Sequence, residues 1–337
     1  MSPSVRLVDT TMRDGSHSVA HQYTPEQVAT VAKMLDDAGV WAVAVGHGDG
    51  LGSASRQYGY AAYPDAELLA AAAEVIERAE IAVALLPGIG TKDDLRAAQD
   101  AGATVVRVST VITEADIGIQ HLKLAGELGM TPHSHLNMAS IGTVEQTVEA
   151  AKIVLDAGSQ CAYLVDTCGA FLQDDVRARV SALREALGDQ IAIGIHEHNN
   201  LSLAVSNSVA AIEEGATIAD VTLAGMGAGA GNCQGEALVA VLHRMGIETG
   251  TDLFALQDAA DSYVRKELMP GPIVVDRLTA SMGYANVPAS LLVPVIRAGQ
   301  RFGVDPRAII LELGERQVVT GQDDLILDVA SRLARAA

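Results

Sequence analysis

The sequence is poor in cysteine and in aromatic residues, and both shortages limit what it can be. Cys161, Cys168 and Cys233 are the only cysteines in 337 residues, and none of them forms a CxxC pair. They offer no disulfide framework, which is typical of a protein in the reducing cytoplasm, where we expect this chain. Aromatic residues make up only 3% of the sequence, so its core must be built mainly from Ala, Val, Leu and Ile.

Positive charge is scarce as well. Lys and Arg together number 23 against 42 Asp and Glu, which gives a formal net charge of −19 at pH 7. A chain this acidic is repelled by nucleic acid and by anionic membrane surfaces, so we expect neither as its main partner. The sequence has no apolar run long enough to cross a bilayer. We also expect no secretory signal, because the first residues lack its basic and then apolar pattern.

Apolar residues, at 49% of the chain, fall into short strand-like runs that alternate with helix-like runs. Eight such units predict an α/β fold, a (β/α)8 TIM barrel over residues 1–250, followed by a helical C-terminal domain over residues 251–337. A doubly wound open sheet is the alternative. The expected strands span residues 5–9, 41–45, 81–86, 104–108, 133–138, 162–165, 191–196 and 219–223.

Polar residues collect where the expected strands end, which favours the barrel over the open sheet. Arg13, Asp14 and His17 follow the first strand, and His196 and His198 lie at the end of the seventh. A TIM barrel places its active site at the carboxyl ends of its strands. We therefore expect these five side chains to meet at one end of the barrel.

Asp14, His196 and His198 are the expected metal ligands. Histidines two residues apart on a strand point to the same face. Two imidazoles and one carboxylate leave coordination positions open for a substrate, as in catalytic sites, and without a thiolate they suit Mn²⁺, with Co²⁺, Mg²⁺ and Zn²⁺ as alternatives. The histidines could instead form a hydrogen-bonded pair at a polar barrel mouth. Asn232 could supply a further oxygen or only stabilise its loop.

Arg13 and His17 lie beside these ligands in the sequence. A guanidinium can bind a carboxylate in bidentate fashion and stabilise a developing enolate oxygen, although Arg13 could also form a salt bridge at the barrel mouth. Histidine can carry a proton near neutral pH, so His17 is the expected proton carrier, with an ordinary loop residue as the alternative. Four other histidines rank below it for these roles: His21, His47, His133 and His135.

Two further segments have both a functional and a structural interpretation. The glycine-rich run 225–232 resembles a dinucleotide fingerprint only superficially, since it ends the eighth unit instead of opening a βαβ unit. We expect its amides to line a site for a small anion. Leu85 and Leu86 end the third strand and Thr167 follows the sixth. We expect these three residues to form walls of a substrate pocket, with the core as the alternative for the leucines.

Several segments together resemble the metal-dependent pyruvate aldolases and, among them, the 4-hydroxy-2-oxovalerate aldolases. That family is part of a barrel group with 3-hydroxy-3-methylglutaryl-CoA lyase and 2-isopropylmalate synthase, and the resemblance covers essentially the whole chain. The matching segments read TMRDGSH at 11–17, HQYT at 21–24, HGDGLG at 47–52, LLPGIGT at 85–91, HEHNNL at 196–201, AGMGAGAGN at 224–232 and GQDD at 321–324.

The resemblance implies a role for each expected site residue. Asp14, His196 and His198 would bind Mn²⁺. Arg13 would stabilise the pyruvate enolate, and His17 would take the proton from the C4 hydroxyl. A bound 4-hydroxy-2-oxo acid, such as 4-hydroxy-2-oxopentanoate, would break between C3 and C4 into pyruvate and an aldehyde, with the metal as a Lewis acid. A place in the catabolism of aromatic hydrocarbons is implied as well.

Two positions depart from the family pattern. Where the family usually has a tyrosine in a Gly-Val-Tyr-Ser-Ser stretch, residues 286–290 read Asn-Val-Pro-Ala-Ser, so Pro288 takes the place of the tyrosine, with Tyr284 nearby. The residue between the two histidines, which is often small, is Glu197. The family tyrosine shapes the aldehyde side of the pocket. We therefore place Tyr284 and Pro288 at the substrate pocket and, with Ala84 beside the leucines, expect a roomier aldehyde side.

The resemblance also implies partners. Family members usually act in complex with an acylating acetaldehyde dehydrogenase that receives the aldehyde, and we expect residues 251–337 to make that contact, within a homo-oligomer or a hetero-oligomer. Two alternative functions stay open. One is an acyl-CoA lyase or synthase of the same barrel group, for which the sequence shows no basic cluster to hold the CoA phosphates. The other is an inactive barrel that serves as an assembly subunit of the dehydrogenase.

Overall fold

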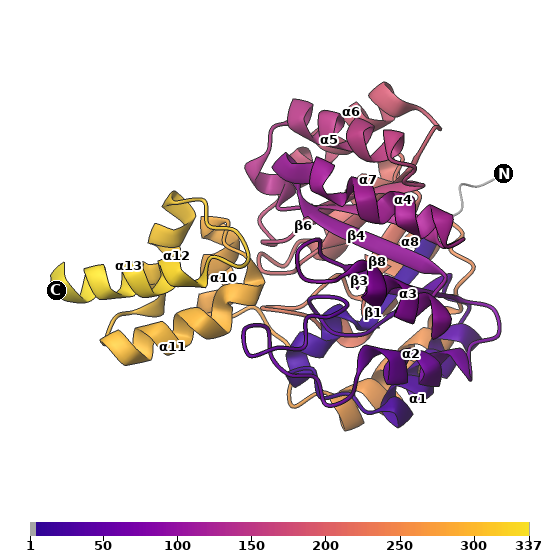
Figure 1. Ribbon diagram of the computed structural model, residues 1–337, viewed down its shortest axis with the longest axis horizontal. Coiled ribbons are helices and arrows are strands. Elements are labelled where there is room, and N and C mark those ends of the chain that lie inside the picture. Colours follow the sequence, from indigo (N-terminus) through magenta and orange to yellow (C-terminus); the bar gives the residue numbers. More distant parts are fainter. Residues whose placement is uncertain (1–4, 337) are drawn as a thin grey trace.

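The computed structural model describes residues 5–336 and shows a strand barrel with a helical lobe at one end (Figure 1). Each strand is parallel to the next one in the sequence, and β8 pairs with β1, so the sheet closes on itself. The closed barrel confirms the TIM-barrel prediction over the open sheet. Within residues 5–336 the strands are β1 (Arg6–Met12), β2 (Ala42–Val45), β3 (Glu80–Leu85), β4 (Val105–Val111), β5 (Thr131–Asn137), β6 (Cys161–Asp166), β7 (Ala192–Glu197) and β8 (Ile218–Val221).

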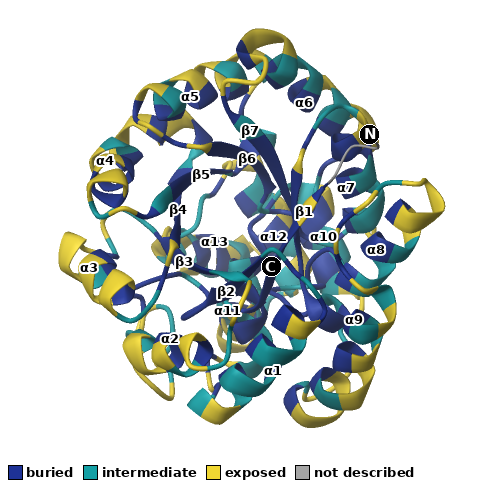
Figure 2. Ribbon diagram, turned by 90° about the vertical axis from the view of Figure 1, so that its right-hand side faces the viewer, coloured by how far each residue is buried: buried dark blue, intermediate teal, exposed yellow. Residues whose placement is uncertain are grey.

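Helices alternate with the strands and surround the barrel, as Figure 2 shows in a view along its axis. Their exposed faces point outward and their buried faces point toward the strands (Figure 2). Every polar loop at the carboxyl end of a strand is thereby held between a strand and a helix. The helices of the ring are α1 (Pro25–Asp37), α2 (Asp65–Ala73), α3 (Lys92–Asp100), α4 (Ile119–Glu127), α5 (Val144–Asp156), α6 (Gln173–Leu187), α7 (Ala204–Glu213) and α8 (Gly235–Arg244).

Helices α1, α3 and α5 begin with a capping box. In each box a threonine side chain accepts a hydrogen bond from the backbone N–H three residues on. The side chain of that later residue accepts one from the backbone N–H of the threonine. Two donors that a helix start leaves free are thus satisfied, so these starts are encoded locally. The pairs are Thr24 with Gln27, Thr91 with Asp94, and Thr143 with Gln146.

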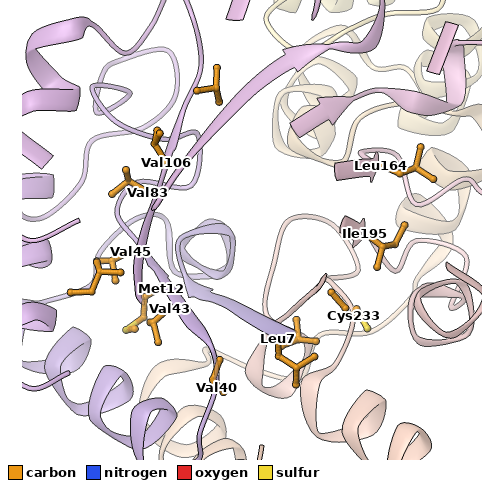
Figure 3. Close-up of a cluster of buried hydrophobic side chains, with 14 of the residues drawn as sticks. Leu7, Met12, Val40, Val43, Val45, Val83, Val106, Leu164, Ile195 and Cys233 are labelled. Carbon is orange, nitrogen blue, oxygen red and sulfur yellow. The ribbon is translucent and has the colours of Figure 1, made fainter. Parts of the chain in front are cut away.

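Side chains alternate along each strand between the outside and the inside of the barrel. The outward ones pack under the helices in the main hydrophobic core, of which Leu7, Val43, Val83, Val106, Leu164 and Ile195 are shown in Figure 3. The inward ones form a smaller cluster of mostly small apolar residues inside the barrel. This inner cluster consists of Val8, Ala42, Ala44, Ala82, Val105, Cys161, Tyr163, Val165 and Ile218.

The described chain beyond β8 is helical, as expected, but it has two parts. Helix α9 (Leu253–Ala259) and the π-helical segment η5 (Ala260–Leu268) contribute to the barrel core. Only the later helices enclose a hydrophobic core of their own, and they form the lobe drawn in yellow and gold in Figure 1. These lobe helices are α10 (Arg277–Ala285), α11 (Leu292–Phe302), α12 (Pro306–Glu315) and α13 (Asp323–Ala336).

The helices of the structure are too short or too polar for the interior of a membrane. Among residues 5–336, none combines the length and the apolar composition that crossing a bilayer demands.

Candidate metal centre and active-site cavity

Asp14, His196 and His198 meet at the carboxyl ends of β1 and β7. Asp14 begins the 3-10 helix η1 (Asp14–Val19) just after β1, while His196 lies in β7 and His198 one residue beyond it. The Nε2 atoms of His196 and His198 lie 3.2 and 3.9 Å from Oδ2 of Asp14. All three side chains are buried. Their donor atoms are therefore grouped closely enough to surround one ion.

The protonation states of these side chains fit a divalent ion. Burial opposes charge on Asp14, but the neighbouring Arg13 guanidinium is the main group that outweighs it and holds the pKa of this carboxyl well below its ordinary value. Burial is the main reason that the pKa of His196 falls to about 3 and that the pKa of His198 is lowered. The site offers one anionic oxygen and two neutral imidazoles, the forms in which these groups bind metals.

The second nitrogen of His196 gives an independent argument for an ion. Nδ1 lies 2.6 Å from Oδ2 of Asp220, so Nδ1 of the neutral ring carries the proton and donates it to that carboxylate. Nε2 is then a bare acceptor, and it faces the Asp14 carboxylate at 3.2 Å. Two acceptors at this distance repel each other unless a cation lies between them. The donor set therefore fits a divalent metal ion.

Arg13 lies beside these ligands. Its Nη1 atom is 3.1 Å from Oδ2 of Asp14 and donates a hydrogen bond to the Gly48 carbonyl at 3.2 Å. Its Nε atom is buried and has no hydrogen-bond partner among the described residues. A guanidinium with an unused N–H at a cavity wall can bind a carboxylate or an enolate oxygen of a substrate.

His17 lies in η1 and lines the same cavity. Its imidazole comes so close to Gly48 that a β-carbon built there would be 2.6 Å from Nε2. His21 stands edge-on to His17, with ring centroids 4.9 Å apart, and stacks on His47 at 3.8 Å. The glycine and the two neighbouring histidines thus fix the position of the His17 ring.

A second group of possible ligands consists of His17, His21 and Asp49. Nδ1 of His21 lies 2.9 Å from Ser16 Oγ and accepts a hydrogen bond from the backbone N–H of Gly48. Burial is the main cause that lowers the pKa of His21 to about 3, so this ring is neutral. A neutral ring whose Nδ1 accepts carries its proton on Nε2 and has no lone pair there for an ion. We therefore assign His21 to supporting His17.

A cavity of about 100 Å³ opens in front of the metal centre. A wider recess of about 280 Å³ adjoins it, and His17 and Ser290 border both. Ser290 belongs to the lobe, so the lobe covers part of the carboxyl end of the barrel. The residues expected from the sequence that line the cavity are Arg13, Asp14, His17, Leu86, Thr167, His196 and His198.

Leu85 was expected at the pocket but does not line this cavity. Side chains alternate along β3, so Ala84 and Leu86 point inward to the cavity while Leu85 packs under the helices in the main core. Leu85 thus belongs to the core, and Leu86 lines the cavity.

Tyr284 and Pro288 do not line the cavity either. Tyr284 lies on the outer surface of α10 and is 79% exposed. Pro288 precedes the short 3-10 helix η6 (Ala289–Leu291), and the residue of that helix that reaches the cavity is Ser290. In the segment 286–290, Ser290 is thus the residue that lines the cavity wall.

Asn232 is buried next to the His198 backbone, with which it forms an isolated β-bridge. Neither atom of its amide group has a hydrogen-bond partner in the described part of the chain. The neighbouring amides of Gly227 and Ala230 donate to Ser18 Oγ and Asn200 Oδ1, so they are not free to bind an anion.

Some cavity residues were not expected from the sequence. Ser109, Asn137 and Val165 line the cavity, and so does His135, which ranked below His17. All four point inward from β4, β5 and β6. The polar character of the strand at residues 133–138 was the signal that could have identified His135 and Asn137.

Arg107 and Asp220 lie inside the barrel next to these residues, and sequence analysis missed both. Arg107 donates through Nε to Nε2 of His135 at 2.8 Å and through Nη2 to Oδ2 of Asp220. Both side chains are almost fully buried, at 1% and 2% exposure. The available signal was a charged residue in the middle of an apolar strand, VVRV at 105–108 and IADV at 218–221.

Known proteins resemble this sequence along its whole length. The HMGL-like family model matches residues 4–262, and the DmpG-like communication domain matches residues 273–335. A 4-hydroxy-2-oxovalerate aldolase of Geobacillus genomosp. 3 is 48% identical over 333 residues, 99% of this chain and 98% of that protein. A protein of the same name from Carboxydothermus hydrogenoformans is 47% identical over 336 residues, 100% of this chain and 99% of that protein.

A solved structure supports the fold independently. The crystal structure of the HMG-CoA lyase from Bacillus subtilis matches with a TM-score of 0.68 at 22% sequence identity, over 81% of this chain and 97% of that chain. At this level of identity the likeness concerns the barrel alone.

Proposed function

Since this chain belongs to the HMGL-like family and, within it, to the 4-hydroxy-2-oxovalerate aldolases, we propose that it cleaves 4-hydroxy-2-oxo acids, such as 4-hydroxy-2-oxopentanoate, to pyruvate and an aldehyde. It is a carbon–carbon lyase that depends on a divalent metal ion. The observation that carries this proposal is the grouping of Asp14, His196 and His198 with Arg13 and His17 around one cavity.

The proposed ion is Mn²⁺, with Co²⁺, Mg²⁺ and Zn²⁺ as alternatives that the same nitrogen and oxygen donors accept. Asp14, His196 and His198 would hold it. When bound, the ion supplies a Lewis acid that polarises the 2-oxo group of the substrate. The remaining chemistry belongs to side chains of this protein.

His17 is the proposed proton acceptor. It takes the proton of the C4 hydroxyl, the electrons of that O–H bond form the aldehyde C=O, and the C3–C4 bond breaks. The electrons of the broken bond pass to the pyruvate half as negative charge on the 2-oxo oxygen. Arg13 stabilises this charge, because its buried Nε–H has no other partner among the described residues. The proton that His17 took is then passed to C3, which completes pyruvate and restores the neutral imidazole.

The helical lobe is the proposed contact for an acylating acetaldehyde dehydrogenase. Residues 273–335 match the DmpG-like communication domain. Tyr284, Leu311 and Leu327 expose apolar surface on the lobe helices. The assembly would be a homo-oligomer or a hetero-oligomer with that partner. We also propose a cytoplasmic location, since the three cysteines are buried and unpaired.

Pyruvate release tests the proposed function. Chelator-treated protein is supplied with Mn²⁺ and 4-hydroxy-2-oxopentanoate, and pyruvate is measured. We expect release that depends on the ion and falls more than about 100-fold in Asp14→Asn, because a direct ligand matters more than its neighbours. Asp93→Asn, at an exposed position of α3, is the matched control and should match the parent.

Three other outcomes of this experiment would contradict the proposal. Equal turnover in Asp14→Asn or in the presence of chelator would exclude the metal mechanism. Turnover of a CoA thioester without pyruvate release from the hydroxy acid would identify an acyl-CoA lyase or synthase. No turnover of either substrate with Mn²⁺ present would identify an inactive assembly subunit.

A further inference from the structure

A charged pair lies inside the barrel, at the level just below the metal centre. Arg107 projects inward from β4 and Asp220 from β8, among inner-cluster residues that are mostly small and apolar. An ion pair this deeply buried adds little stability, because removing two charges from water costs about as much as their attraction returns. Packing alone therefore does not account for an arginine and an aspartate at this place.

The Asp220 carboxylate touches a metal ligand directly. Its Oδ2 atom lies 2.6 Å from Nδ1 of His196, and Arg107 donates to the same oxygen. A carboxylate can only accept, so the bond places the imidazole proton on Nδ1 and leaves the lone pair on Nε2. Nε2 is the nitrogen that faces Asp14 at 3.2 Å. The direction of this one hydrogen bond thus decides whether His196 can bind an ion at all.

Arg107 holds the carboxylate where this bond forms. It uses Nη2 for Asp220 and Nε for Nε2 of His135, so one rigid guanidinium plane connects β8 to β5. The ring of Tyr163, on β6, supports this guanidinium, whose carbon lies 5.2 Å from the ring centroid. The Oδ2 atom of Asp220 is therefore held by Arg107 and accepts from His196 at the same time.

We propose that Asp220 is a positioning residue that fixes His196 in the tautomer able to bind the divalent ion, and that Arg107 keeps Asp220 in place. A histidine ligand that donates its second ring N–H to a carboxylate is both oriented and made a better donor. This inference rests on the proposed metal centre, but it assigns a role to two residues that touch neither the ion nor the substrate.

The affinity of the protein for Mn²⁺ tests the proposal without any assay of turnover. Asp220→Asn keeps the shape of the side chain and removes the fixed acceptor. We expect its dissociation constant for Mn²⁺, measured by electron paramagnetic resonance on chelator-stripped protein, to rise about 10–100-fold. Asp9→Asn is the matched control: Asp9 is equally buried, accepts from the backbone N–H of Thr11, and should leave the constant within about twofold of the parent.

Thermal unfolding of the metal-free proteins separates positioning from structural support. If Asp220→Asn lowers the melting temperature but binds Mn²⁺ like the parent, Asp220 is only structural and the proposal is wrong. If the parent itself binds no divalent ion, the proposed metal centre and this inference fail together. If the parent binds the ion and Asp220→Asn binds it equally well, only this inference fails.

The tautomer can be observed in the parent, so the test does not depend on the folding of the variant. Nitrogen-15 labelling of histidine in the metal-free protein, with His196→Gln to assign the signal, shows which ring nitrogen carries the proton. We expect a slowly exchanging proton on Nδ1 of His196. A proton on Nε2 in the metal-free parent would overturn the proposal.

Discussion

The imidazole of His17 occupies the space that a side chain at position 48 would need. A β-carbon built on Gly48 would lie 2.6 Å from Nε2 and 2.7 Å from Cδ2 of His17, far inside van der Waals contact. Gly48→Ala must therefore displace the His17 ring. We expect kcat for pyruvate release to fall about 100-fold, since a shift of about 1 Å at a proton acceptor costs that much. Mn²⁺ affinity should stay close to that of the parent.

Gly126→Ala is the matched control for that substitution. Gly126 lies in α4 and has no heavy atom within 4 Å of a β-carbon built on it. Alanine is a better helix former than glycine, so this variant should be as active as the parent and slightly more stable. Parent-like kcat in Gly48→Ala would show that the ring position of His17 does not limit the reaction.

Stability of the metal-free protein should depend on pH through His133. Burial, with Arg107 and Arg6 nearby, lowers the pKa of His133 to about 3, below its ordinary value of 6.5. Between these values the unfolded chain binds a proton that the folded protein does not. The contribution of the neutral His133 ring to the free energy of unfolding is therefore complete above pH 6.5. As the pH falls toward 3, this contribution decreases by up to about 1.4 kcal/mol per pH unit.

Urea unfolding at pH 7.5 and at pH 5 measures this contribution. The loss of unfolding free energy between the two values should be smaller in His133→Gln than in the parent. His243→Gln, at an exposed position of α8, is the control and should lose as much unfolding free energy between the two pH values as the parent. Other buried groups also titrate, so the comparison between parent and variants is the measure. An identical loss in His133→Gln and the parent would exclude His133.

The lobe is joined to the barrel by a hydrogen bond from Ser140 Oγ to Asn286 Oδ1 at 2.6 Å. Asn286 ends α10 with a φ of 57°, a conformation that asparagine and glycine tolerate better than alanine. Ser140→Ala and Asn286→Gly should each lower the free energy of unfolding by about 1 kcal/mol, which is the contribution of the lost hydrogen bond. Asn286→Ala should cost about 1 kcal/mol more, and denaturant unfolding measures all three. Equal free energies of unfolding for Asn286→Ala and Asn286→Gly would contradict this account.

The cavity should accept 4-hydroxy-2-oxo acids longer than five carbons. If His17 receives the proton of the C4 hydroxyl, the chain beyond C4 reaches the adjoining recess that His17 and Ser290 border. Values of kcat/KM for six- and seven-carbon acids should therefore lie within about tenfold of the five-carbon value. Ser290→Phe should lower kcat/KM for the longer acids at least about tenfold more than for the five-carbon acid. A strict preference of the parent for five carbons would count against the roomier pocket.

The sequence predicted the barrel because its signals are local and repeat. Each threonine of a capping box finds its partner three residues away, and strand ends carry polar residues that a parallel closed sheet must bring to one end. Asp14 and His196 are 182 positions apart, yet their meeting follows from this topology alone. The distance of 3.2 Å between Nε2 of His196 and Oδ2 of Asp14, on which the binding of an ion depends, cannot be derived from the sequence.

What the sequence left undecided is the direction in which single side chains point. Leu85 and Leu86 look alike in the sequence, and only the register of β3 places one in the core and the other at the cavity. Tyr284 was expected at the substrate pocket but is exposed on α10, because the lobe packs by contacts distant in the chain. Arg107 and Asp220 were missed for a related reason: whether a charge in an apolar strand faces outward or inward depends on the whole sheet.

The inner cluster determines from which end of the barrel small molecules can reach the candidate site. Val8, Val105 and Ile218 fill the inside of the barrel near the amino ends of the strands, whereas the cavity lies at the carboxyl ends and is bordered by Ser290 of the lobe. We therefore expect small molecules to reach Asp14, His196 and His198 from the side of the lobe, and a ligand bound to the lobe next to Ser290 to slow their exchange.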